Sequence, residues 1–219
     1  MKRGMMLWMV ALAMLLPGGL CLAEDVSGPM KQIAAQNGGA LANLEFEIQS
    51  ALARRRAGGL GVCIVDDGTF VTSTLDTNLT PELIKKILIR VPGNSDETIP
   101  ARLLGIDRQT GLTFIKAERR PENGNWSVVR FAKRQLTPGQ PVVSLGLMGR
   151  ELGLKPYLGL AYVSVVARAP QRLVYTTGGN LTGLGSPVFT TDGLAVGLVR
   201  QQLYQSYQMV GPQGRPVNM

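Results

Sequence analysis

A glycine-rich loop at residues 180–189 holds a serine that could do chemistry in this chain. The stretch reads Asn-Leu-Thr-Gly-Leu-Gly-Ser-Pro-Val-Phe, with Ser186 just before an apolar run. A serine hydroxyl is a poor nucleophile until a neighbouring base takes its proton, and that base is usually histidine. The chain contains no histidine. The usual general base for acyl transfer is therefore missing, and so is the commonest metal ligand.

An unconventional site would pair a serine with a lysine whose pKa is lowered by burial. The candidate nucleophiles are Ser186 and Ser73, and the candidate bases are Lys116, Lys133 and Lys155. Pro187 follows Ser186 directly, which restricts the backbone around the candidate nucleophile. The other interpretation is that Ser186 is a packing residue.

A third candidate nucleophile is Cys63, which lies in an apolar run between Val62 and Ile64. A thiol buried in such a strand has a raised pKa and is inert, so we predict a core residue. The remaining cysteine, Cys21, belongs to the leader described below, so no internal disulfide is expected. We expect neither a metal site nor a cofactor, because aspartates such as Asp192 stand in turn sequences.

Residues 1–23 have the pattern of a secretory signal peptide, with a basic start, a short apolar run and a cleavage sequence ending at Ala23. We therefore expect export to the periplasm or beyond, with membrane contact only through an uncleaved leader. Lys2 and Arg3 supply two of the eight net positive charges, so 8 − 2 leaves +6 on the rest of the chain. Residues 54–56, Arg-Arg-Arg, lack interleaved aromatics and predict a solvated loop and no nucleic-acid binding.

Many glycines and prolines between short apolar runs favour an all-β fold. Residues 24–43 are predicted to be a lead-in segment with a short helix near 30–36, and the first strand is expected to begin at Leu44. An Asp-Asp-Gly turn predicts a hairpin of residues 60–65 and 69–72, and Thr80-Pro81 predicts a helical turn over 81–86. The other strand candidates are 87–91, 101–106, 113–117, 128–131, 141–145, 158–166, 173–177, 187–189 and 195–200.

The order and spacing of these segments resemble trypsin-like serine proteases of the HtrA/Deg type. Residues 59–64, Gly-Leu-Gly-Val-Cys-Ile, are similar to the first motif of that family, and the Val-Thr-Asn-x-His segment resembles residues 71–75 with Leu75 at the histidine position. The Gly-x-Asp-x-x-Thr-Asp-Leu-Ala segment resembles residues 105–113, which puts Gly111 at the aspartate position.

The nucleophile motif of that family, Gly-x-Ser-Gly-Gly-Pro, resembles the loop before Phe189 when it is anchored on Pro187. Leu184 then stands at the nucleophile position, Gly185 is retained, and Ser186 replaces the second glycine. Residues 183–186 are a remnant of the loop that holds the oxyanion in this family, since backbone donors do not depend on side chains. The loop residues are Gly183, Leu184, Gly185 and Ser186.

The resemblance implies two antiparallel six-stranded β-barrels with a cleft between them. The barrels would span residues 44–120 and 121–200, followed by a tail at 201–219, and no PDZ domain is expected. With all three triad positions apolar or glycine, we expect no catalysis, because removing such a triad lowers kcat by about 10⁶-fold.

Three functions are open at this point. The first is binding of an extended peptide or protein partner in the cleft, with Leu75 and Leu184 in its floor. The second is a hydrolase with a Ser-Lys site. The third is a structural module of envelope assembly, in which the chain could form oligomers.

Overall fold

The computed structural model describes residues 27–51, 53–76, 79–122, 124–167 and 172–200, and two short strands further on. Those strands, β12 (Met209–Val210) and β13 (Pro216–Val217), pair with each other. The predicted leader and most of the predicted tail lie outside the described residues. Within the described ranges, no helix is long and apolar enough to cross a membrane.

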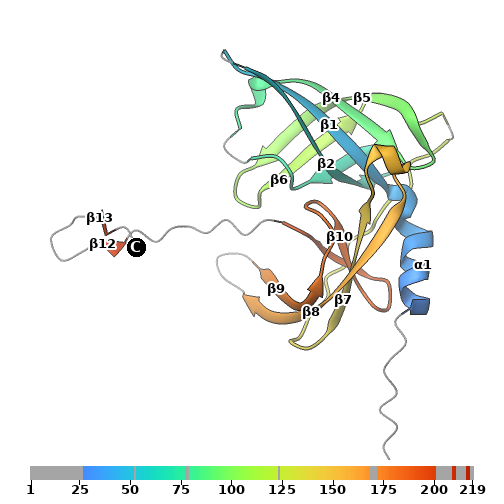
Figure 1. The fold of residues 1–219 in the computed structure, drawn as a ribbon, viewed down its shortest axis with the longest axis vertical. Helices are drawn as coiled ribbons and strands as arrows, with labels where there is room; N and C mark the ends of the chain where they lie inside the picture. The colour runs from blue at the N-terminus through green and yellow to red at the C-terminus, as the bar shows by residue number, and fades with distance from the viewer. Residues whose placement is uncertain are drawn as a thin grey trace, which may run out of the picture.

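The first half of the chain is a closed, six-stranded antiparallel barrel in the order β1-β2-β3-β6-β5-β4 (Figure 1). Its strands are β1 (Leu41–Gln49), β2 (Arg54–Val65), β3 (Thr69–Thr72), β4 (Ile84–Val91), β5 (Asn94–Asp107) and β6 (Leu112–Ala117). The predicted hairpin around the Asp-Asp-Gly turn is confirmed as β2 and β3. The prediction of a six-stranded barrel in this half is confirmed as well.

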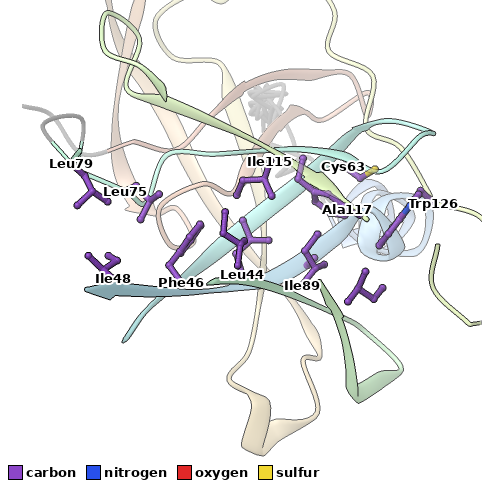
Figure 2. Close-up of a cluster of buried hydrophobic side chains, with 14 residues drawn as sticks. Leu44, Phe46, Ile48, Cys63, Leu75, Leu79, Ile89, Ile115, Ala117 and Trp126 are labelled. Carbon is purple, nitrogen blue, oxygen red and sulfur yellow. The ribbon is translucent and has the colours of Figure 1, made fainter. Parts of the chain in front are cut away.

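Alternating apolar residues fill this barrel, as the period of a half-buried strand requires. On β1 the side chains of Leu44, Phe46 and Ile48 point inward and are at most 4% exposed. Figure 2 shows them with side chains from other strands of the barrel. Trp126, which lies beyond the last strand, closes one end and meets Phe70 edge-to-face with ring centroids 5.0 Å apart.

The second half is a five-stranded antiparallel sheet in the order β11-β10-β7-β8-β9. Its strands are β7 (Pro141–Leu147), β8 (Pro156–Ala167), β9 (Leu173–Asn180), β10 (Pro187–Thr190) and β11 (Ala195–Leu198). The prediction of a second six-stranded barrel is not confirmed, because β9 and β11 are edges with no described strand between them. The predicted strand at 128–131 contributes only one bridge, from Phe131 to Ala195.

The N-terminal segment is more ordered than its polar composition predicts. Helix α1 (Ser27–Asn37) leads through η1 (Gly38–Ala40) directly into β1, so the barrel begins at Leu41 and not at Leu44. The physical reason is that Ile33 and Leu41, each at most 1% exposed, are buried in a cluster with the second half. The helix packs against β7 and β8 (Figure 1).

One local prediction is wrong and another is confirmed only in part. The Arg-Arg-Arg run is the start of β2 and not a loop, because it pairs with the end of β1 and Arg54 donates to Glu47 at 2.6 Å. The predicted helical turn over 81–86 is only η2 (Pro81–Leu83), since the apolar alternation that follows is recruited into β4. A third short 3₁₀ turn, η3 (Arg150–Leu152), connects β7 and β8.

One buried cluster joins the two halves. Leu41, Val62 and Val71 from the barrel pack with residues of the second sheet, chiefly Val143 and Phe189. These five side chains are at most 3% exposed. The halves therefore share a core, which fixes the pocket between them.

Candidate functional site

A pocket of about 370 Å³ lies where the barrel meets the second sheet. Its lining is formed by Asn43, Gly58, Gly59, Leu60, Thr74, Leu147, Met148, Gly149, Gly183 and Leu184. The side chains are apolar apart from one amide and one hydroxyl, and the glycines expose backbone. Such a lining suits an apolar group held by a few backbone hydrogen bonds.

The floor of the pocket comes from the glycine-rich part of β2. Register pairs Leu60 with Asn43 and Gly59 with Leu44 on β1, which brings the two strands to the pocket together. A Cβ at Gly59 would collide with the side chain of Thr74. Glycine is therefore needed there for Thr74 to approach the strand.

The opposite wall is the predicted oxyanion loop, which is anchored by its backbone. Gly185 donates to the Val199 carbonyl at 2.8 Å, and Ser186 donates to the Gly183 carbonyl at 3.2 Å. Gly185 has φ +84°, and a Cβ there would press on the Leu60 carbonyl, so no other residue fits. Leu184 is 37% exposed and lines the pocket.

Leu75 does not lie in the floor of the cleft, contrary to the prediction. It is 7% exposed and belongs to the core of the first barrel, where Figure 2 shows it beside Leu79. Its chain neighbour Thr74 lines the pocket instead. The Thr72 hydroxyl donates to the Leu60 carbonyl at 2.6 Å, so the Thr74 hydroxyl must donate to the Thr72 oxygen, 2.8 Å away. Thr74 is thereby left as an acceptor.

Gly111, at the aspartate position, is buried in the turn between β5 and β6 and does not line the pocket. Its φ of +72° is in the left-handed region, and its N–H donates to the Asp107 carbonyl at 2.8 Å. Hydrogen bonds from the hydroxyl and N–H of Thr110 lower the pKa of Asp107. Asp107 therefore organises the turn through its hydrogen bonds to Thr110. Of the three triad positions, only Leu184 lines the pocket.

The backbone N–H groups at the positions that match the oxyanion donors of the resemblance can be located in the loop. In triads of this kind the donors are the N–H groups of the nucleophile position and of the residue two before it. These correspond to Leu184 and Thr182. The Thr182 N–H donates to the Ser144 hydroxyl at 2.7 Å, so it is engaged. Among the described residues, no backbone hydrogen bond of turns and loops has the Leu184 N–H as its donor.

The structure forms no serine-lysine pair among the described residues. Ser186 is fully buried, and its hydroxyl has no hydrogen-bond partner there. Lys116 is ion-paired with Asp67, and Lys133 and Lys155 are exposed. The other candidate nucleophile, Ser73, donates to the Val199 carbonyl at 2.7 Å and so ties the barrel to the end of β11.

Cys63 is a core thiol, as predicted. It is 0% exposed, and its sulfur donates to the Val65 carbonyl at 3.1 Å. Burial raises the pKa of the Cys63 thiol to about 12 from an ordinary value of 9.0. At neutral pH the thiolate is therefore negligible, and Cys63 is not a nucleophile.

This burial predicts a loss of stability in alkali. Below about pH 9 the thiol is protonated in both states, and its contribution to stability is fully present. As pH rises toward 12, the unfolded chain releases the proton first, so the free energy of unfolding falls. Urea denaturation at pH 8, 9.5 and 10.5 should show a steeper decline for the parent than for Cys63→Ala. Equal slopes would contradict this role.

No group of three His, Cys, Asp or Glu side chains in the described ranges could hold a metal ion. Sequence reasoning missed the pocket residues Asn43, Thr74, Leu147 and Met148, which come from separate segments and share no motif. The Gly58-Gly59 doublet was the one available signal, since paired glycines inside a strand mark a close approach.

Comparison with known proteins supports the sequence resemblance at the level of the family. The model of the trypsin-like peptidase domain family matches residues 59–198, which is more than half of the chain. The comparison with curated proteins gives no match. The matched region runs from Gly59, within β2, to the end of β11 and includes the loop with Gly183 and Leu184. The chain therefore belongs to the family of trypsin-like peptidase domains.

Proposed function

We propose that this protein is a non-catalytic, HtrA-like trypsin domain that binds an extended segment of a protein partner between its two halves. The predicted leader makes export to the periplasm or beyond part of this proposal. The observation that carries it is an unpaired strand edge beside an apolar pocket. An edge supplies main-chain hydrogen bonds and a pocket supplies side-chain selection, which are the two requirements of strand addition.

The edge is the first part of β2. Strand β3 pairs with β2 only between Val62 and Val65, whereas β1 pairs with β2 from Arg54 onward. Residues 54–59 therefore have β1 on one side and no paired strand on the other among the described residues. Gly58 and Gly59 lie on this stretch and line the pocket, so an added strand would pass directly over it.

The pocket has the chemistry for one apolar side chain. Leu60, Leu147 and Leu184 supply branched walls, and Met148, 40% exposed, supplies an adaptable one. The only polar side chains in the lining are Asn43 and Thr74, neither of which is ionised. The lining contains no general base, which is why we infer binding without hydrolysis. The alternative of a Ser-Lys hydrolase gains no support from Ser186, whose hydroxyl has no hydrogen-bond partner among the described residues.

Filling the pocket should abolish peptide binding. Gly183 lines the pocket, and a Cβ there meets nothing within 4 Å, so Gly183→Leu places a side chain in the space without a clash. We expect the variant to lose at least about tenfold in affinity for peptides selected from a random library, as measured by fluorescence polarisation. The matched control is Gly105→Leu, at a glycine with equally open surroundings outside the pocket.

A second pair of variants tests whether binding depends on the pocket or on exposed apolar side chains in general. Leu184 and Leu194 are both 37% exposed, and only Leu184 lines the pocket. Leu184→Glu should weaken binding as Gly183→Leu does, and Leu194→Glu should not. A parent that binds no library peptide at micromolar concentration, or equal losses in the two glutamate variants, would overturn the proposal.

A further inference from the structure

A row of basic side chains crosses the outer face of the first barrel. Arg56 on β2 and Lys86 on β4 both lie opposite Glu47 on β1. On the other side of β4, Ile87 pairs with Ala101 and Leu88 with Pro100. The same register sets Lys86 beside Arg102.

The row then continues to β6. Arg102 on β5 lies directly opposite Lys116. The chain neighbours Ile87, Ala101 and Ala117 belong to or pack against the barrel core. Because side chains alternate along a strand, the basic residues point outward, and Arg56, Lys86 and Arg102 are exposed.

One carboxylate, Glu47, lies within the row between Arg56 and Lys86, and another, Asp67, contacts Lys116; both are already engaged. Glu47 forms an ion pair with Arg54, in which Oε1 lies 2.6 Å from Nη2. Asp67 forms an ion pair with Lys116. The hydrogen bond from Arg54 is the largest cause that lowers the pKa of Glu47, and the charges of Arg56 and Lys86 add to it. Within the described ranges, no carboxylate oxygen lies within 4.0 Å of Arg56, Lys86 or Arg102.

Within this row, Lys86 and Arg102 are neighbouring like charges that no described carboxylate neutralises. Like charges opposite each other on neighbouring strands are destabilising, and Lys86, Arg102 and Lys116 occupy three adjacent strands. A solvated surface would be more stable with alternating signs. A ligand of opposite charge would turn this repulsion into attraction.

We propose that this row, Arg56, Lys86, Arg102 and Lys116, is a docking surface for an extended acidic segment of a partner protein. Charge complementarity sets the sign of the partner. The shape of the surface favours a flexible partner. The row bends around a closed barrel, so a flat membrane or a stiff duplex can contact only part of the row. A flexible chain with carboxylates at alternate positions can follow the row across the strands. A recess of about 160 Å³ lies on the row, lined by Arg56, Lys86 and Leu88 and also by Glu45, Phe46, Glu47 and Arg90. Both of its carboxylates are ion-paired with arginines, Glu45 with Arg90 and Glu47 with Arg54.

Binding of a fluorescent peptide of alternating Glu and Ser by the purified chain tests this surface. We expect saturable binding that weakens with added salt, because these charges are exposed and screened. The double variant Lys86→Gln/Arg102→Gln should lose about tenfold in affinity. The control Arg108→Gln/Lys133→Gln, which removes two exposed cations elsewhere, should stay within about twofold. The thermal midpoint of the first double variant should not fall, since like-charge repulsion is relieved.

Equal losses of peptide affinity in the two double variants would show that binding depends only on net charge, and this would overturn the proposal. So would tighter binding of anionic vesicles or of a single-stranded oligonucleotide of the same charge. The pocket variant Gly183→Leu should bind the acidic peptide as the parent does, so this surface and the pocket between the halves are tested separately.

Discussion

Replacing Phe189 with alanine should lower the free energy of unfolding by about 3–5 kcal/mol, the usual cost of truncating a fully buried aromatic side chain. Phe189 is 0% exposed on β10, in the cluster that joins the two halves. The truncation removes apolar contacts and leaves a cavity that the surrounding β-strands cannot close. Urea denaturation followed by far-UV circular dichroism measures the change.

The control is Phe131→Ala, because Phe131 is 41% exposed and its loss should cost under about 1 kcal/mol. Trp126 adds a local probe, since it is buried in the first barrel while Phe189 lies on the other side of the junction. A shared core predicts that tryptophan fluorescence and circular dichroism report one coincident transition in both variants. Separate transitions would show that the halves unfold independently and would contradict the joined core.

Rebuilding the triad at the aligned positions should fail to restore peptidase activity. The variant Leu75→His/Gly111→Asp/Leu184→Ser supplies the correct residue types at the places that match the family motif. However, the side chain at position 75 enters the barrel core and does not line the pocket, so the imidazole would be buried without a described polar partner. We expect no turnover of unfolded casein and no labelling by a fluorophosphonate probe.

The same variant should lose about 3–5 kcal/mol of stability. Most of this comes from Leu75, where an apolar core residue gives way to a polar group without a hydrogen bond. A smaller part comes from Gly111, whose φ of +72° disfavours any side chain. Leu184→Ser alone is the control and should change stability by less than about 1 kcal/mol, since Leu184 is partly exposed. Measurable hydrolysis by the triple variant would mean that Leu75 can turn outward into the cleft.

Much of the first barrel could be predicted from local pattern. Alternation through Leu44, Phe46 and Ile48 predicts the half-buried strand β1, and Asp67-Gly68 predicts the turn between β2 and β3. The burial of Cys63 follows from its apolar neighbours in the same way. These features depend on residues within a few positions of each other, so the sequence contains all the information they need.

The identity of the residues at the triad positions was also determined by the sequence, but their placement was not. Thr74 and Leu75 are adjacent, and motif alignment cannot say which of them lines the cleft. The folded barrel determines which one does. Leu75 packs in the apolar core of the barrel. Thr74 lines the pocket, where its hydroxyl hydrogen-bonds to Thr72 and its side chain occupies the space left by Gly59.

Non-local pairing explains the remaining differences. Residues 54–56 look like a solvated loop because nothing nearby in sequence neutralises them, yet Glu47 lies across the strand and accepts from Arg54. The absence of a described strand between β9 and β11 could not be read from strand candidates one at a time, because closure depends on which edges meet. The sequence by itself therefore determined most of the strands, the inert thiol and the absence of histidine. Only the tertiary structure decided the pocket, the unpaired edge of β2 and the basic row, because each arises from side chains that are brought together by pairing between strands distant in the chain.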